Sequence, residues 1–198
     1  MEALEDVPYV AARAALPEHL EQRKKRGSDR MRYIADTTEF QIEEPTIVTL
    51  GKFDGRHRGH QKLLRTMMEL KAETGYPTAI FTFGTAPGTA VTGKPQTVIT
   101  TNLERRANME KVGIDYLVEY PFTEETRHME PEAFVKDILA GRMHAREIVV
   151  GPDCSFGYKG AGSAELLSAM ARDLGYHLHV IEKEKDHRRD ISSTYIRE

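Results

Sequence analysis

The feature that most constrains the fold is a glycine-rich segment at residues 51–60, which reads Gly-Lys-Phe-Asp-Gly-Arg-His-Arg-Gly-His. The apolar run before it, residues 46–50, is typical of a buried strand, and residues 61–70 have helical periodicity. A turn between a strand and a helix N-terminus presents unpaired backbone N–H groups to an anion, and glycine lets the backbone approach it closely. His57 and His60 stand three residues apart where the turn enters the helix, a spacing that can direct both imidazoles at one anion. The segment predicts a phosphate-handling site.

Composition excludes several classes of protein. The chain has 198 residues and a net charge of −3, which argues against broad, non-specific affinity for nucleic acid. Its one cysteine, Cys154, excludes an intramolecular disulfide and suits a reducing compartment. No apolar run approaches the roughly 18 residues of a membrane span, and the acidic N-terminus lacks a signal-peptide layout. We expect a soluble cytoplasmic protein that binds neither nucleic acid nor a membrane, and the oligomeric state stays open.

Strand-like runs alternate with helical patterns from residue 46 onward. The strand candidates are residues 46–52, 77–83, 115–120, 146–151 and 177–182. This alternation predicts an α/β fold, a Rossmann-like parallel five-stranded sheet with helices on both faces. Ligands bind such sheets at the carboxyl ends of the strands, beside the point where the strand order reverses. The 51–60 segment lies at a strand end of this kind.

Three of the helices between these strands carry recognisable boundary residues. In the second of them, Phe134, Ile138 and Leu139 form the apolar stripe that we expect to be buried. The first is expected to begin at Thr101, which forms a capping box with Glu104, and to end at Gly113. The second is expected to run from Pro131 to Gly141, and the third from Ser163 to Gly175.

One further segment could contribute to a phosphate site, and one loop stands out by its composition. Residues 191–197, Ile-Ser-Ser-Thr-Tyr-Ile-Arg, combine hydroxyls with an arginine, which together can hold phosphate oxygens. Taken alone, such hydroxyls are more often helix caps. Residues 149–162 follow a strand and contain Pro-Asp and four glycines, which a simple turn-forming loop would also explain.

The segments at residues 51–60 and 191–197 resemble, in the right order, the two signatures of the nucleotidylyltransferase superfamily. The extended form of residues 51–60 is closer still to bacterial FAD synthetase, the FMN adenylyltransferase half of the bifunctional riboflavin kinase/FAD synthetase family. The loop at 149–162 resembles that family's Val-Gly-x-Asp/Asn-Phe-x-Phe-Gly element, with Cys154 in place of an aromatic residue. The resemblance covers about residues 31–198, so residues 1–30, which end in a basic, turn-rich stretch, are expected to be an N-terminal extension or linker.

The resemblance implies transfer of AMP from ATP to FMN, with FAD and pyrophosphate as products. Mg²⁺ is expected to be bound mainly through substrate phosphates, with no protein ligand named. The implied catalytic residues are His57, His60, Ser193 and Arg197. The implied nucleotide-binding residues are Gly51, Lys52, Phe53, Asp54, Gly55, Gly59, Asp153, Phe156, Gly157, Ser192 and Thr194.

Two departures from the family pattern keep other functions open. After the second strand candidate the family usually has Phe-x-Pro-His-Pro, whereas this chain has Gly-Thr-Ala-Pro at residues 84–87. The bifunctional proteins also continue into a riboflavin kinase domain, whereas this sequence stops at Glu198, and we expect it to lack that activity. The alternatives are a nucleotidylyltransferase with a different acceptor and a nucleotide-binding remnant that does not turn over.

Overall fold

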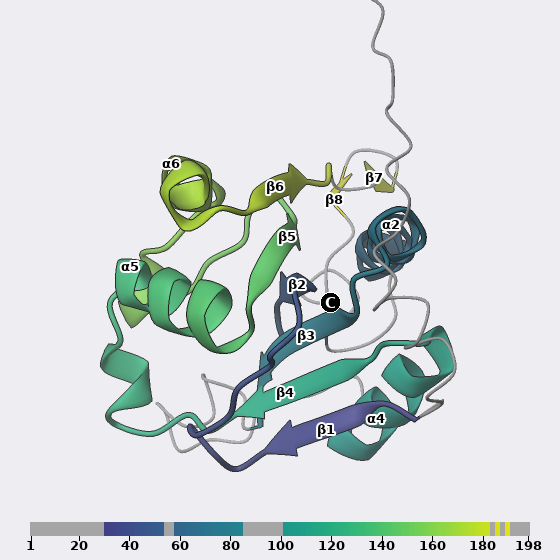
Figure 1. The fold of residues 1–198 in the computed structure, drawn as a ribbon, viewed down its shortest axis with the longest axis horizontal. Coiled ribbons are helices and arrows are strands. Elements are labelled where there is room, and N and C mark those ends of the chain that lie inside the picture. Colours follow the sequence, from purple (N-terminus) through teal and green to yellow (C-terminus); the bar gives the residue numbers. More distant parts are fainter. Residues whose placement is uncertain (1–29, 54–57, 85–100, 183–184, 187–188, 191–198) are drawn as a thin grey trace, which may run out of the picture.

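The computed structural model describes residues 30–53, 58–84, 101–182, 185–186 and 189–190. A parallel six-stranded sheet forms its centre, with the strand order β1-β4-β3-β2-β5-β6 (Figure 1). The strands are β1 (Arg32–Ala35), β2 (Thr46–Leu50), β3 (Thr78–Phe83), β4 (Tyr116–Tyr120), β5 (Ala145–Val150) and β6 (His177–Val180). A two-stranded antiparallel hairpin, β7 (Lys185–Asp186) and β8 (Arg189–Asp190), follows the sheet.

The predicted α/β fold and all five predicted strands are confirmed. The number of strands was wrong by one, because β1 adds a sixth strand at the edge beside β4. This strand has only four residues, and its first two are exposed while the last two are half-buried. It therefore lacks the apolar alternation by which a strand is recognised in sequence.

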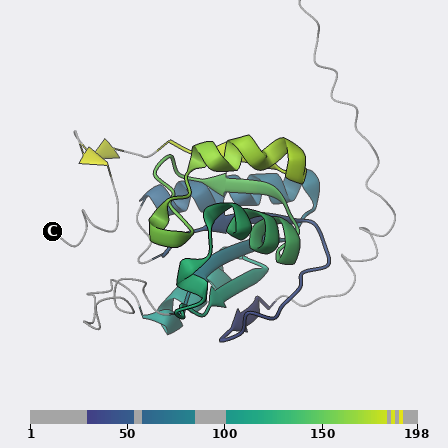
Figure 2. The same cartoon turned by 90° about the vertical axis from the view of Figure 1, so that its left-hand side faces the viewer.

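Helices cover both faces of the sheet. On one face lie α2 (Arg58–Thr74) and α4 (Asn102–Val112), and on the other lie α5 (Pro131–Ala133), the π-helical segment η2 (Phe134–Arg142) and α6 (Ala164–Leu174). Two short 3₁₀ turns, η1 (Thr126–His128) and η3 (Tyr158–Gly160), belong to the connecting loops. In Figure 2, η2 and α6 lie on the near side of the sheet and α2 lies on the far side.

Each face has its own apolar core. Beneath α2 and α4 the buried side chains include Leu64, Met67 and Met109. The other core contains Phe134, Ile138 and Leu139, as predicted, together with Leu167 of α6. Burial on both faces explains why the central strands read as almost continuous apolar runs.

Most of the predicted helix boundaries are confirmed. Thr101 and Glu104 form a capping box, and Gly113 ends α4 in the left-handed conformation. Ser163 caps α6 and Gly175 ends it in the same way. The prediction that Gly141 ends its helix was wrong, because the π-helical turns continue to Arg142, and the N–H of Met143 donates to the carbonyl of Ile138 at 2.8 Å.

The strand order reverses between β2 and β5. From β2 the chain moves through β3 to β4 on one side, and β5 and β6 then fill the other side. The carboxyl ends of β2 and β5 therefore lie side by side at the edge of the sheet where open α/β sheets bind ligands. Within the described ranges, none of the helices has the length and apolar character needed to span a bilayer.

Candidate active site

The turn after β2 leads directly into the first turn of α2. The N–H of Gly51 donates to the carbonyl of Phe81 at 3.1 Å, which continues the pairing with β3 to the end of the strand. Helix α2 begins at Arg58, so Gly59 and His60 lie in its first turn, where the positive end of the helix dipole favours an anion. The predicted position of His60 at a helix N-terminus is confirmed.

Phe53 is buried beneath this turn. Its side chain is 2% exposed and belongs to the core under α2, and its backbone is left-handed, with a φ of 46°. The Phe53 ring lies against the imidazole of His60, with 4.8 Å between the ring centroids and 31° between the planes. Phe53 therefore supports His60 with its ring and is itself buried. Lys52, by contrast, is exposed.

The loop after β5 is shaped by two close-packed positions. Phe156 is buried, packs against Phe134 with 5.4 Å between the ring centroids, and pairs through both backbone hydrogen bonds with Gly162. Gly157 has a φ of 71°, and a Cβ at this position would lie 2.7 Å from the Cα of Pro131. The side chain of Phe156 and the missing side chain of Gly157 thus fix the shape of the loop, and Asp153 is exposed upon it.

Cys154 in the same loop is a packing residue. It is partly buried and lies against the core beneath α6. Burial, with smaller contributions from the carboxylates of Asp153 and Glu165, raises the pKa of its thiol to about 11. A thiol that stays protonated at neutral pH is a poor nucleophile.

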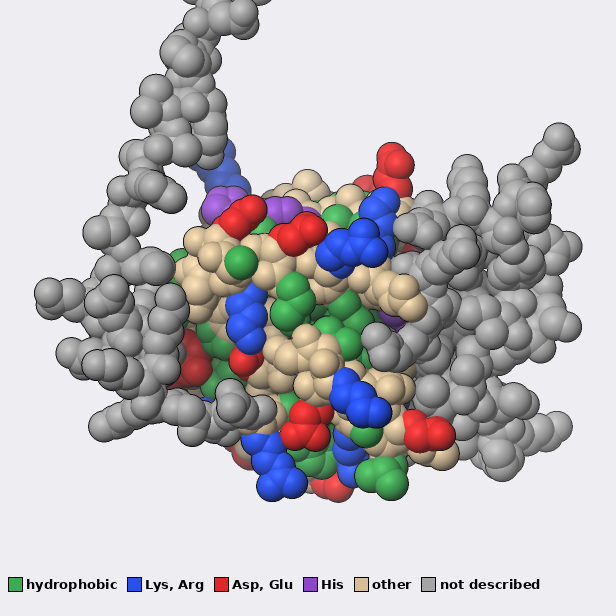
Figure 3. Space-filling model, turned by 90° about the vertical axis from the view of Figure 1, so that its right-hand side faces the viewer, with side chains coloured by type: hydrophobic (Ala, Val, Ile, Leu, Met, Phe, Trp, Pro, Cys, Tyr) green, Lys and Arg blue, Asp and Glu red, His purple; other side chains and the backbone are tan. Residues whose placement is uncertain are grey.

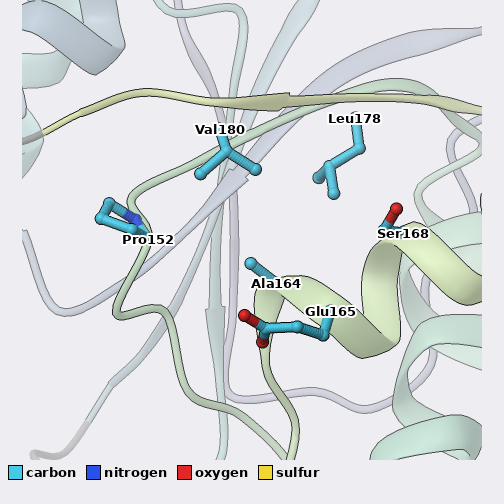
Figure 4. A pocket seen from close by; sticks show the side chains of 6 residues that line it. All are labelled: Pro152, Ala164, Glu165, Ser168, Leu178 and Val180. Atoms are coloured by element: carbon cyan, nitrogen blue, oxygen red, sulfur yellow. The ribbon is translucent and has the colours of Figure 1, made fainter.

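A hollow of about 330 Å³ lies between α6 and β6 (Figure 4). It is lined by Pro152, Ala164, Glu165, Ser168, Leu178 and Val180. Pro152 follows β5 and Val180 ends β6, so the hollow opens at the carboxyl edge of the sheet, next to the loop that carries Asp153. Its walls combine apolar side chains with one carboxylate and one hydroxyl, the kind of mixture found in small-molecule sites. Pro152 belongs to the loop at residues 149–162 that the sequence singled out, whereas the sequence had indicated no site role for the other five lining residues.

The other face of β6 is fixed to β5 by a carboxylate. Glu147 on β5 has its two oxygens within hydrogen-bond distance of His177 Nδ1, at 3.1 Å, and His179 Nε2, at 2.7 Å. Histidine side chains gather beside acidic ones along the upper edge of the face shown in Figure 3. Because side chains alternate along a strand, these contacts hold β6 from the side opposite to Leu178 and Val180.

Aromatic side chains gather at the carboxyl ends of β3 and β4. The ring of Phe83 lies edge-on to those of Phe122, at 5.0 Å, and Phe81, at 5.5 Å. Tyr120 adjoins Phe81 with 5.4 Å between the centroids. Phe83 and Phe122 are each half-buried, so they present aromatic surface on the side of β2 opposite to the hollow.

Several predicted site residues lie outside the described part of the chain. They are Asp54, Gly55, His57, Ser192, Ser193, Thr194 and Arg197, together with residues 85–87 of the unusual loop. Among the residues that are described, no cluster of three or more His, Cys, Asp or Glu side chains has the arrangement of a metal site.

Comparison with known proteins identifies the family. The family model for FAD synthetase matches residues 39–195. The chain belongs to the FAD synthetase family. A bifunctional riboflavin kinase/FMN adenylyltransferase from Listeria monocytogenes is 32% identical over 163 residues, which cover 81% of this chain and 51% of the relative. An FAD synthetase from the same organism is 31% identical over 153 residues, which cover 76% of this chain and 61% of the relative.

These FAD synthetase relatives are longer than the present chain, which spans 51% and 61% of their lengths. Among solved structures, one described as a macrolide-efflux protein from Streptococcus pneumoniae has a TM-score of 0.72 and 26% identity. The likeness covers 84% of this chain and 54% of that one. It shows that the sheet and its helices follow an arrangement already observed by crystallography.

Proposed function

We propose that this FAD synthetase domain transfers AMP from ATP to FMN, giving FAD and pyrophosphate. The observation that carries the proposal is the position of His60 in the first turn of α2, beside the reversal of strand order, in a chain whose family is FAD synthetase. The proposed setting is the cytoplasm, with ATP and FMN as small-molecule partners.

The proposed nucleotide site lies on the β5 and β6 side. The nucleoside of ATP would occupy the hollow between α6 and β6, with Asp153 and the loop after β5 against it. The phosphates would then extend toward the turn after β2. There the backbone at Gly51, Lys52, Phe53 and Gly59 and the helix N-terminus would receive them, as anions are commonly bound in α/β proteins.

The proposed acceptor site lies on the β3 and β4 side. A flavin ring is flat and largely apolar, and Phe83 and Phe122 offer aromatic surface at the carboxyl ends of these strands. Offset and edge-on contacts between aromatic rings contribute about 0.5–1.5 kcal/mol beyond area burial. The FMN phosphate would then face the ATP phosphates above β2.

In the proposed reaction an oxygen of the FMN phosphate attacks the α-phosphorus of ATP. A new P–O bond forms in line with the bond that breaks, and pyrophosphate leaves with the electron pair. No protein nucleophile is needed, since positioning and charge stabilisation carry such transfers. His57 and His60 would donate hydrogen bonds to ATP phosphate oxygens.

The segment at residues 191–197 completes the proposed phosphate site. Ser192, Ser193, Thr194 and Arg197 would hold the β- and γ-phosphates through hydroxyl donors and a guanidinium fork. Magnesium would be bound by the phosphates and water, as is common for this ion, and would neutralise charge on the leaving pyrophosphate.

The test is to incubate the purified chain with ATP and magnesium, and separately with FMN, riboflavin, phosphopantetheine or nicotinate mononucleotide. Products are identified by mass. FAD should form only when FMN is the acceptor. Riboflavin should give no dinucleotide, because it has no phosphate oxygen to attack the α-phosphorus of ATP. A dinucleotide formed only with another acceptor would refute the flavin assignment. Binding of ATP and FMN without any product would indicate the non-catalytic alternative.

A further inference from the structure

A buried carboxylate stands behind the proposed acceptor site. Glu119 lies one residue before the end of β4, and its side chain is 2% exposed. Arg105 Nη2 donates to one of its oxygens at 2.6 Å, while Arg106 Nη2 and the Tyr33 hydroxyl donate to the other at 2.8 and 2.5 Å. Burial alone would raise the pKa of this carboxyl, but the hydrogen bonds from Arg106, Tyr33 and Arg105 outweigh it and hold the pKa below its usual range. Glu119 is therefore a charged anchor that joins α4, β4 and β1, three elements that lie together at one end of the sheet in Figure 1.

Arg105 connects this anchor to the end of β3. Its side chain is 10% exposed, and the same Nη2 that meets Glu119 also donates to the carbonyl of Phe83 at 3.4 Å. The N–H of that peptide unit, on Gly84, donates to the carbonyl of Tyr120 at 3.1 Å. Both polar atoms of the 83–84 peptide are thus held, which fixes its plane where the chain leaves β3.

We propose that Arg105, oriented by Glu119, is a positioning residue for the flavin acceptor. By fixing the 83–84 peptide it sets the direction of the Phe83 ring, which lies edge-on to Phe122 in the aromatic surface proposed to receive the flavin. The inference rests on the proposed transfer to FMN and adds a residue that would act on acceptor binding without touching the flavin.

Arg106 supplies a matched control. It binds the same carboxylate and also lies over the Tyr33 ring, with 4.0 Å between the guanidinium carbon and the ring centroid. Its side chain is 37% exposed, and its described contacts include none with the backbone of β3. Removing either arginine leaves Glu119 with one arginine and Tyr33. The variants then differ in the link to Phe83, which Arg105 makes, and in the contact with the Tyr33 ring, which Arg106 makes.

The experiment compares Arg105→Ala with Arg106→Ala in the full chain. FMN affinity is measured by quenching of flavin fluorescence without ATP, ATP affinity by calorimetry, and KM and kcat by FAD formation. Arg105→Ala should raise the Kd and KM for FMN about fivefold to tenfold, the scale of losing one typical hydrogen bond. The kcat and the Kd for ATP should stay within about twofold of wild type. Arg106→Ala should change the Kd for FMN by less than about twofold.

Arg105→Lys separates the link to Phe83 from the ion pair. Lysine keeps a charge beside Glu119, but its Nζ lies one bond closer to the backbone than the Nη2 of arginine, so it should keep the ion pair and lose the 3.4 Å hydrogen bond to the Phe83 carbonyl. Arg105→Ala should also lower the Tm, because it removes one partner of the buried Glu119 carboxylate. Arg105→Lys should restore that Tm while the Kd for FMN stays at least threefold above wild type, the scale of one weakened hydrogen bond. This variant also carries the test if Arg105→Ala fails to fold.

Equal changes in FMN affinity for Arg105→Ala and Arg106→Ala would overturn the inference, as would an equal loss of ATP affinity in Arg105→Ala. If wild type makes FAD and Arg105→Ala binds FMN normally, the inference fails and the proposed function stands. If wild type binds FMN but forms no FAD, the proposed function fails, and the difference in FMN affinity still decides the inference. Absence of FMN binding to wild type would overturn both.

Discussion

Gly157 should resist replacement more strongly than glycines whose surroundings are open. An alanine Cβ there would lie 2.7 Å from the Cα of Pro131 and 2.8 Å from its N and Cγ. The proline begins α5 and cannot rotate away, and overpacking of this kind costs about 1–3 kcal/mol. The backbone, with φ 71° and ψ −170°, lies in a region that costs a non-glycine residue about 1–3 kcal/mol more. We expect Gly157→Ala to lower the free energy of unfolding by about 4 kcal/mol, the middle of the summed range.

Gly175→Ala is the matched control. Gly175 has φ 70° and ψ 40°, and an added Cβ would meet nothing within 4 Å, so only the cost of the left-handed backbone remains, about 1 kcal/mol. For a domain of this size, 1 kcal/mol shifts Tm by about 2–4 °C. Thermal melts followed by circular dichroism should therefore show a loss of about 8–16 °C for Gly157→Ala and about 2–4 °C for the control. Equal melting temperatures would refute the packing argument and return Gly157 to a role in ligand contact alone.

Three further outcomes are expected. His60→Ala should lower turnover by about two to three orders of magnitude, the scale of losing one positioned donor, with FMN affinity nearly unchanged; turnover within a fewfold of wild type would contradict the phosphate role. Cys154 should react with iodoacetamide about two orders of magnitude more slowly at pH 7.5 than an unperturbed thiol, because its pKa is about 11, and mass spectrometry of native and urea-unfolded chain should show this difference. Glu119 has a lowered pKa, so its stabilising effect is present above its unfolded pKa of about 4.3 and is lost as pH falls through the folded value. Glu119→Gln should therefore be less stable at pH 7 and lose stability less steeply below about pH 5, and parallel stability curves for both chains would oppose this.

The sequence was sufficient for the interior of the fold. The inner strands are apolar runs because helices cover both faces, and the turns between them carry the capping residues that end α4 and α6. Strand β1 was not predicted because it pairs with β4, whose residues are more than 80 positions away in the sequence, and because its own four residues have no periodic pattern. The helix end predicted at Gly141 was wrong because a helix tolerates an interior glycine where the surrounding chain is well packed.

The site was predictable in location and less so in the role of each residue. A motif places Phe53, Phe156 and Gly157 near a ligand, but it cannot distinguish a residue that touches the ligand from one that supports the touching residue. The structure directs both phenylalanines into the cores. The contact between Arg105 and Phe83 spans 22 residues, and the α6–β6 hollow depends on how a helix docks on an edge strand. Neither leaves a local signal in the sequence.

The strand order also gives a physical reason why two anionic substrates could meet at one point. β3 and β5 are the two neighbours of β2, and strands in a sheet lie about 4.8 Å apart, so their carboxyl ends are separated by roughly 10 Å. In the proposed transfer, ATP approaches from the β5 side and FMN from the β3 side, which leaves room for about two phosphate groups above β2. The chain places the N-terminus of α2 and His60 at this point, where the positive end of the helix dipole offsets the repulsion between the phosphates. The central position of β2 would thus bring the two phosphate-bearing substrates together over one helix N-terminus, where positioning and charge stabilisation can act on both.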